Sequence, residues 1–344
     1  MNVHEKYMLR AIELAEKGLG SVSPNPLVGA VLVYNDKIIG EGFHEQYGKA
    51  HAEVNCLNSV REEDKHLISE ATLYVTLEPC SHYGKTPPCA DLIIANKIPR
   101  VVVGHQDPFA EVAGKGIARL RENGVEVTTF VLEKESAFQN RRFLTFQTKK
   151  RPYIILKWAE SADGFIAPKD NIPYWLTNEH SKKLSHKWRT EEDAIMVGYN
   201  TVLRDNPQLT ARLWKGRNPV RIVIDEQLAL TKNAKVFNDE ARTIIFNFVE
   251  DKTENNLQFI KLNSEKNLAH EIAHKLYAEK IQSVIIEGGT KLLSKFIAEK
   301  LWDEARIFKT EIELKNGIAT PKISAINATK TAIENDLLLK YYNL

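Results

Sequence analysis

The chain reads Pro79-Cys80-Ser81-His82-Tyr83-Gly84-Lys85-Thr86-Pro87-Pro88-Cys89 directly after a predicted strand, and His51-Ala52-Glu53 precedes that strand. One imidazole, from His51, and two thiolates, from Cys80 and Cys89, make a three-ligand zinc set. A catalytic zinc site has three protein ligands and keeps its fourth position open for water. The sequence therefore predicts a catalytic site that holds one Zn²⁺ per chain.

Glu53 is separated from His51 by one residue, and both lie at the start of a helix predicted over residues 51–60. This spacing differs from the His-Glu-x-x-His motif, in which two ligands share one helix face. We interpret Glu53 as a proton shuttle that does not bind the metal. The combination matches the signature of zinc deaminases, in which the metal activates water and a glutamate is the general acid and base.

Two other interpretations of these residues stay open. With His82 as a fourth ligand the site would be closed and structural, since structural zinc sites normally have four protein ligands. Alternatively, the thiols are inert and buried, which is how we interpret Cys56, one turn along the helix from His51. The three cysteines of the chain are an odd number and do not encode a disulfide framework.

The composition is that of an ordinary globular protein. The chain has 344 residues, 43% hydrophobic and 27% charged, and this length suggests two domains. A formal net charge of +2 argues against a large nucleic-acid interface. No apolar run approaches the ~18 residues of a membrane helix, and the N-terminus has no apolar signal core. We therefore expect a cytoplasmic protein that binds neither nucleic acid nor membrane.

Strand and helix patterns alternate in both halves, which predicts two α/β domains with some parallel strand pairing. A polar region over residues 133–151 predicts a solvated boundary, which we place between residues 147 and 148, and residues 250–267 predict a surface excursion. The predicted helices cover residues 3–19, 51–60, 91–96, 116–122, 178–189, 267–279 and 291–299. The predicted strands cover residues 28–34, 37–42, 71–77, 100–104, 125–127, 153–156, 194–198, 220–225, 242–248 and 283–287.

Further motifs of the first half refine the deaminase interpretation. Eight residues separate Cys80 from Cys89, more than in nucleic-acid deaminases. With Ser23-Pro24-Asn25-Pro26-Leu27-Val28-Gly29 and His51-Ala52-Glu53, this segment closely resembles the bifunctional deaminase/reductase family of riboflavin biosynthesis. The resemblance implies that Asn25 and His82 contact the substrate, with Lys85 and Thr86 close by.

The second half resembles the reductase domain of the same family, with its motifs in the same order. They are Leu156-Lys157, Ser161-Ala162-Asp163-Gly164, Trp175-Leu176-Thr177, residues 198–207, residues 209–212, residues 221–225 and Glu287-Gly288-Gly289-Thr290. The resemblance covers about residues 1–310. Glu160, Pro173 and the tail after Lys309 depart from the family's pattern, and these departures concern reductase affinity and cofactor preference.

A strand over residues 283–287, the turn Gly288-Gly289 and a helix beginning near Thr290 predict an anion site, because free N–H groups at a helix N-terminus bind phosphate. The motif is not Gly-x-Gly-x-x-Gly, so a Rossmann domain is not indicated. The resemblance implies a fold similar to dihydrofolate reductase that uses NADPH. It implies cofactor contacts from Ala159, Trp175, Thr201, Asp205, Gly289, Thr290, Lys291, Leu292, Leu293, Ser294 and Lys295. It implies substrate contacts from Arg189, Leu209, Arg212 and Glu287, and the two arginines suit a phosphate clamp.

Taken together, the resemblance implies an α/β enzyme of two domains. Residues 1–147 are expected to form a three-layer, cytidine-deaminase-like zinc domain that deaminates a diamino-pyrimidinone ribosyl phosphate. Residues 148–344 are expected to form the NADPH-dependent reductase, which converts the ribosyl to a ribityl group. The family also suggests a homodimer or homotetramer. The alternatives are a nucleoside or tRNA deaminase with an appended domain that is not a reductase, and a zinc module without catalysis. The near-neutral charge argues against the first, and Glu53 argues against the second.

Overall fold

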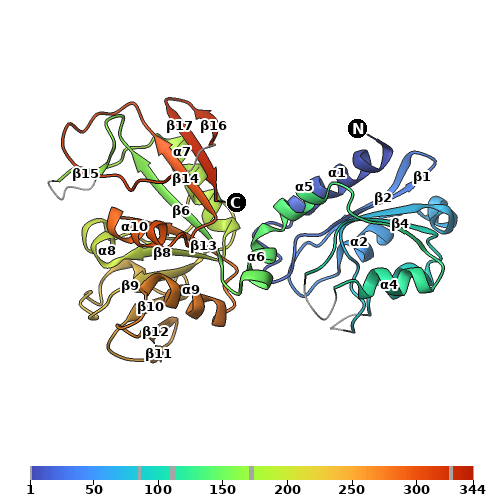
Figure 1. Ribbon diagram of the computed structural model, residues 1–344, viewed down its shortest axis with the longest axis horizontal. Coiled ribbons are helices and arrows are strands. Elements are labelled where there is room, and N and C mark those ends of the chain that lie inside the picture. The colour runs from blue at the N-terminus through green and yellow to red at the C-terminus, as the bar shows by residue number, and fades with distance from the viewer. Residues whose placement is uncertain (1, 84–86, 109–112, 170–173, 325–327, 344) are drawn as a thin grey trace. The chain divides into compact units, whose positions relative to one another are not determined.

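The computed structural model describes residues 2–83, 87–108, 113–169, 174–324 and 328–343. The chain divides into two compact units, residues 1–149 and 150–344 (Figure 1). Each unit is an α/β structure with its own sheet, so the expected fold class is confirmed. No helix in the described ranges is long and apolar enough to cross a membrane.

The first unit is built on a five-stranded sheet of order β2-β1-β3-β4-β5. The strands are β1 (Gly29–Tyr34), β2 (Lys37–Phe43), β3 (Thr72–Leu77), β4 (Arg100–His105) and β5 (Glu126–Thr128). β1 is antiparallel to β2 and β3, whereas β3, β4 and β5 are parallel. Asn35 and Asp36 join β1 to β2 with φ of 45° and 59°, the backbone that a two-residue hairpin turn requires.

Helices cover both faces of this sheet, which gives the three layers that the family resemblance implies. α1 (Val3–Glu16) packs on the face that carries Val31 and Val33. The helices α2 (Ala52–Asn58), α3 (Cys89–Ala95) and α4 (Lys115–Glu122) pack on the face that carries Leu32 and Leu73. Figure 1 shows α1 and α5 (Glu133–Gln139) on one side of the sheet and α2 and α4 on the other. The alternation of side chains along a strand supplies both apolar faces.

α1 lies so close to β1 that only glycine fits at one point of their contact. A Cβ at Gly29 would lie 1.9 Å from the carbonyl oxygen of Ala11. We therefore expect Gly29→Ala to lower the free energy of unfolding of the first unit by about 1–3 kcal/mol, as overpacking does. Calorimetry of the whole chain measures this. Gly198→Ala is the control, since a Cβ there meets nothing within 4 Å, and equal stability of the two variants would contradict the prediction.

The second unit contains a ten-stranded sheet of order β11-β12-β10-β9-β8-β13-β6-β14-β17-β16. The strands from β12 to β14 in this order are parallel, while β11, β17 and β16 are antiparallel to their neighbours. Their bounds are β6 (Tyr153–Glu160), β8 (Ala194–Gly198), β9 (Val220–Ile224), β10 (Thr243–Asn247), β11 (Lys252–Glu254), β12 (Leu257–Lys261), β13 (Ser283–Glu287), β14 (Glu304–Lys309), β16 (Ala328–Ile333) and β17 (Asp336–Tyr342). A separate pair, β7 (Phe165–Ala167) with β15 (Ile318–Ala319), is antiparallel.

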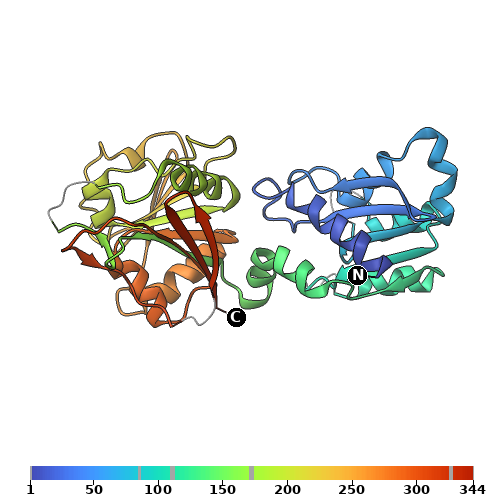
Figure 2. The ribbon, with the colours of Figure 1, turned by 90° about the horizontal axis from the view of Figure 1, so that it is seen from above.

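Helices again cover both faces of this larger sheet. α9 (Leu268–Ala278) and α10 (Thr290–Ala298) bury their apolar side chains against one face. α7 (Glu179–Glu191) and α8 (Tyr199–Asp205) pack on the other, with Trp188 stacked on Phe308. Figure 2 shows the yellow-green α7 and the orange α9 and α10 on opposite sides of the sheet.

Two expectations about polar segments are partly right. The units divide between residues 149 and 150, at the exposed end of the polar region 133–151. Most of that region is nevertheless folded, because α5 and α6 (Arg141–Lys149) occupy it and α6 buries Phe143 and Phe146. Arg151 forms a bidentate pair with Asp303, with both side chains largely buried. The predicted excursion over residues 250–267 contains β11 and β12, of which β12 extends the parallel sheet. The helical turns η1 (Glu62–Glu70) and η2 (Lys235–Phe237) were not predicted from the sequence.

Candidate active sites

His51, Cys80 and Cys89 lie together in the first unit. Their three ligand atoms are all within 4.8 Å of one another. His51 Nδ1 is 3.3 Å from Cys89 Sγ and 3.7 Å from Cys80 Sγ. These are the residue types and the separations of a zinc site with three protein ligands.

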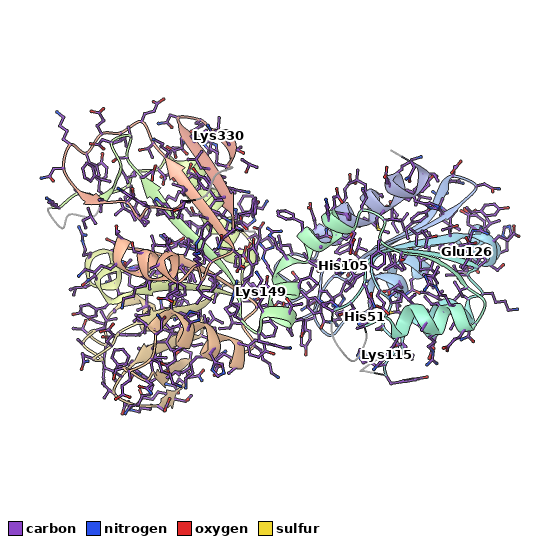
Figure 3. All side chains as sticks on the ribbon, in the orientation of Figure 1. His51, His105, Lys115, Glu126, Lys149 and Lys330 are labelled. Atoms are coloured by element: carbon purple, nitrogen blue, oxygen red, sulfur yellow. The ribbon has the colours of Figure 1, made fainter. Side chains whose placement is uncertain are left out.

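The local fold explains why these residues meet. His51, labelled in Figure 3, is the N-cap of α2, and Cys89 is the first residue of α3. Cys80 follows the end of β3, and its Sγ accepts a hydrogen bond of 3.3 Å from the backbone N–H of Cys89. The Cys80 carbonyl also accepts from Ala90 N at 3.1 Å. These two hydrogen bonds hold Cys80 and Cys89 close together, although eight residues separate them in the sequence.

Glu78 fixes the other side of the Cys80 segment. It is buried, and its carboxylate accepts hydrogen bonds from Gly114 N and Gly116 N, each at 2.9 Å. It accepts a longer one of 3.2 Å from Ile117 N. A carboxylate at the N-terminus of a helix satisfies donors that have no partner within the helix. Glu78 thus ties the segment that carries Cys80 to the start of α4, a contact that the sequence analysis missed.

The described residues include no fourth His, Cys, Asp or Glu in this ligand group. His82 is exposed and lies outside the group, so the closed structural site is not what the described part of the chain forms. Cys56 is fully buried in the core between α2 and the sheet, as its interpretation as a core thiol requires. Lys85 and Thr86 fall outside the described residues.

The three ligand groups change one another's pKa values. The Cys89 thiol, and after it the His51 ring, lower the pKa of Cys80 against the opposing effect of burial. Contact with Cys80 raises the pKa of His51. Contact with Cys80, and then burial, raise the pKa of Cys89. Zinc binds thiolates and neutral imidazole, so its binding releases the protons that the cluster holds. The donor set therefore fits a zinc ion.

Glu53 is only 3% exposed. It lies in the first turn of α2, two residues after His51. Burial, and then the charge of Cys80, raise its pKa above the usual range of a glutamate. A raised pKa favours the protonated carboxyl, and enzymes tune the pKa of general acids and bases by burial of this kind. This is the property that a proton shuttle needs.

Asn25 is placed beside the cluster by a buried histidine that the sequence analysis missed. His44 Nε2 is 3.1 Å from Asn25 Nδ2, and His44 Nδ1 is 2.9 Å from the carbonyl oxygen of Ala50. The His44 ring meets the His51 ring edge to face. Burial lowers the pKa of His44, which keeps it neutral near pH 7. The structure thus brings Asn25 to the ligand group through His44.

A second polar cluster lies in the second unit, where β13 ends. Glu287 and Lys157 are register partners on the adjacent parallel strands β13 and β6. Lys157 Nζ is 3.6 Å from one Glu287 oxygen, and an Arg189 nitrogen from α7 is 3.2 Å from the other. Burial opposes ionisation of Glu287, but the two cations outweigh it and lower the pKa. Lys157 therefore joins this cluster, and its strand register with Glu287 is the signal that finds it.

The other predicted substrate residues of this unit lie near Arg189. Arg189 donates to the carbonyl oxygen of Thr210 at 3.2 Å, and Thr210 adjoins the buried Leu209. Arg212 is exposed. Partial burial of its guanidinium, and then the charge of Arg189, lower the pKa of Arg212. The structure therefore groups Arg189, Leu209, Arg212 and Glu287.

Several of the predicted cofactor residues lie at the turn between β13 and α10. Gly289 is the N-cap of α10, and a Cβ there would meet nothing within 4 Å. Gly288 has φ of 116°, and a Cβ there would lie 2.6 Å from the hydroxyl of Thr201, so the turn and Thr201 are in contact. The Thr290 hydroxyl donates to the carbonyl oxygen of Ala319, in the tail that departs from the family's pattern.

The remaining predicted cofactor residues are distributed around this turn. Leu292 and Leu293 point into the apolar core, so only their backbone is available to a ligand. Trp175 is 67% exposed, with Lys182 Nζ 4.7 Å from its ring centre. Of the others, Ala159 and Ser294 are partly buried, and Asp205, Lys291 and Lys295 are exposed. Glu160, the unusual residue next to Ala159, accepts a hydrogen bond from the Trp158 ring nitrogen at 3.1 Å. Pro173 lies outside the described residues.

Comparison with known proteins gives matches for both units. The cytidine and deoxycytidylate deaminase zinc-binding region matches residues 1–105, and the RibD C-terminal domain matches residues 152–310. The chain is 42% identical over 313 residues to the riboflavin biosynthesis protein RibD of Aquifex aeolicus (strain VF5), which covers 89% of this chain and 86% of that protein. It is 35% identical over 322 residues to RibD of Escherichia coli (strain K12), covering 88% of this chain and 86% of that protein.

Solved structures agree with these matches. A diaminohydroxyphosphoribosylaminopyrimidine deaminase/5-amino-6-(5-phosphoribosylamino)uracil reductase from Thermotoga maritima superposes with a TM-score of 0.89 at 38% identity, covering 99% of this chain and 98% of that one. Acinetobacter baumannii RibD, form 1, superposes with a TM-score of 0.87 at 31% identity, covering 99% and 98%. The similarity extends through both units, which disfavours a deaminase joined to an unrelated domain.

Proposed function

The chain belongs to the RibD family of riboflavin biosynthesis, with a zinc-dependent deaminase domain and an NADPH-dependent reductase domain, and from this premise we propose the residues that perform each reaction. Residues 1–147 form the deaminase and residues 148–344 the reductase. The substrate is a 2,5-diamino-6-ribosylamino-pyrimidinone 5′-phosphate, which loses its 2-amino group before its ribosyl group is reduced to ribityl. The observation that carries the proposal is the open three-ligand cluster beside the buried Glu53.

His51, Cys80 and Cys89 hold the zinc ion in the deaminase domain. When bound, zinc supplies the positive charge that activates a water molecule for attack on the ring carbon. Glu53 takes a proton from that water and passes one to the leaving amino group, which departs as ammonia. Asn25, positioned by His44, and His82 bind the pyrimidine. Because Glu53 is buried in the first turn of α2, beside the ligand group, it is placed to take part in both proton transfers.

Cys80→Ala should remove most of the zinc, since it deletes one of only three protein ligands. Metal analysis of the purified protein is expected to give one zinc per wild-type chain and much less for the variant. Cys56→Ala is the matched control, because Cys56 is buried away from the ligand group. Full zinc content in Cys80→Ala would show that the three-residue ligand set is wrong.

In the reductase domain, the residues at the end of β13 and β6 bind the sugar. NADPH, when bound, supplies the hydride that reduces the anomeric carbon. The open space at Gly289 and the N–H groups at the start of α10 fit a phosphate of the cofactor. Opening of the ribosyl ring turns the ring oxygen into a hydroxyl and needs a proton there. Lys157 and Glu287 are the paired groups at this place that give and take protons, and Arg189 and Arg212 bind the sugar phosphate.

One assay tests the assignment of both reactions. Ammonia release is measured from the pyrimidine ribosyl phosphate, from cytidine and from tRNA, and NADPH oxidation is followed by absorbance in the same mixture. We expect ammonia from the first compound alone, followed by NADPH oxidation. Ammonia from cytidine or tRNA, or deamination without NADPH oxidation, would contradict the proposal. Assembly into a homodimer or homotetramer, and a cytoplasmic location, stay predictions from the family.

A further inference from the structure

Several buried polar side-chain atoms of the reductase domain have no hydrogen-bond partner among the described residues, and three of them belong to Arg189 and to residues near it. These three are His186 Nδ1, Arg189 Nε and Thr210 Oγ1. His186 is 3% exposed and Thr210 is 2% exposed. A buried polar atom without a partner costs free energy, so native proteins contain few of them, and several together need an explanation. A ligand that bonds to all three would provide it.

The three atoms lie in one place. Arg189 donates to the carbonyl oxygen of Thr210 at 3.2 Å, which puts these two residues in contact. His186 precedes Arg189 by one turn of α7, and Lys182 precedes His186 by another, so the three side chains share a face of the helix. At one end of this face Lys182 lies over Trp175, and at the other Arg189 meets Glu287. His186 is therefore between two parts of the reductase site.

His186 is neutral in these surroundings. Burial, then the charges of Arg189 and Arg212, lower its pKa to about 4, with Lys182 adding to this and Glu287 opposing it. A neutral imidazole carries one N–H donor and one acceptor. Arg189 and Arg212 are close enough for one to lower the pKa of the other. The site thus combines two mutually repelling cations with uncharged donors, which suits an anion with several acceptor oxygens.

We propose that His186 and Thr210 bind the phosphate group of the ribosyl phosphate substrate, together with Arg189. This inference rests on the proposed reductase function. All three unpartnered atoms can donate: an imidazole N–H, a guanidinium N–H and a hydroxyl. Phosphate oxygens only accept, so one phosphate satisfies all three, and its negative charge relieves the repulsion between Arg189 and Arg212. A sugar hydroxyl, which is itself a donor, matches this set less well.

The test compares two reductase substrates, the deaminated intermediate with its phosphate and the same compound without it. His186→Leu removes the imidazole at similar volume, and His186→Asn keeps a hydrogen-bonding group near the position of Nδ1. We expect His186→Leu to raise the KM for the phosphorylated intermediate about tenfold, the effect of losing a hydrogen bond to a charged group. With the dephosphorylated compound it should match the wild type, and His186→Asn should recover part of the loss.

Controls separate this inference from the function on which it rests. His180→Leu, an exposed histidine of the same helix, should leave both KM values unchanged, and Thr210→Val, which removes a donor at similar volume, should repeat the effect of His186→Leu. Equal effects of His186→Leu on both substrates, or no effect on either, would overturn the phosphate contact. Arg212→Ala could raise the KM for the phosphorylated compound alone while His186→Leu does not. In that case only this inference fails, and the proposed function stands. If the wild type itself does not reduce the intermediate, the proposed function fails as well.

Discussion

Glu53→Gln is expected to keep its zinc and its fold while deamination slows by about two to four orders of magnitude, the usual contribution of a general acid and base. The amide has nearly the shape of the carboxyl, so the core around α2 is preserved, but it cannot take up a proton. Because Glu53 is buried, water cannot easily replace it as a proton carrier. Ammonia release from the pyrimidine ribosyl phosphate, measured at equal zinc content, gives the result.

The second domain supplies an internal control for this variant. Glu53→Gln should reduce the deaminated intermediate with NADPH at the wild-type rate, since Glu53 belongs to the first unit and Glu287 to the second. Glu53→Asp, which keeps the charge on a shorter side chain, should lose part of the deaminase activity and not all of it. Deamination by Glu53→Gln within tenfold of the wild-type rate would show that Glu53 has another role.

Arg212→Ala should have the opposite profile, with normal ammonia release and poor reduction. A hydrogen bond to a charged group contributes about 1.5–3 kcal/mol, which corresponds to about one to two orders of magnitude in reductase kcat/KM. The exposed Arg212 is not part of the core, so the domain should remain folded. Initial rates of NADPH oxidation with the deaminated intermediate measure the change.

Arg212→Lys tests whether the charge or the planar group of Arg212 matters. Lysine keeps the charge but cannot make two parallel hydrogen bonds to a phosphate. We expect its kcat/KM to lie between those of the wild type and Arg212→Ala. Arg217→Ala, a nearby arginine that pairs with Asp193, is the control. Reduction by Arg212→Ala at the wild-type rate would remove Arg212 from the substrate site.

The sequence predicted the elements that have strong local patterns. The hairpin at Asn35-Asp36, the helix over residues 267–279 and the strand over residues 283–287 are present because turn chemistry and apolar periodicity act over a few residues. α6 was missed because its charged residues hide two buried phenylalanines in a helix of 9 residues. β14 and β17 were missed because they are stabilised by each other and by β6, far away in the sequence.

In the candidate sites, too, the sequence predicted residues that belong to short motifs and missed residues that act through contacts with distant segments. The zinc ligands and Glu53 could be proposed because the chemistry restricts them to particular residue types and spacings. His44, Glu78 and His186 could not, because each acts through contacts with residues from other parts of the chain. Lys157 stood in a recognised motif, but its partnership with Glu287 depends on the register of two strands. Sequence patterns therefore identify the reacting groups better than the residues that position them.

The order of the strands also affects how the protein matures during synthesis. The five strands of the first sheet come from residues 29–128, so this domain can fold and take up its metal while the ribosome is still making the second. β6, the first strand of the second sheet, must wait for β13 and β14 to be made, and β14 in turn pairs with β17 near the end of the chain. Since domains generally fold from the N-terminal end during translation, we expect the deaminase domain to be folded before the reductase domain is complete.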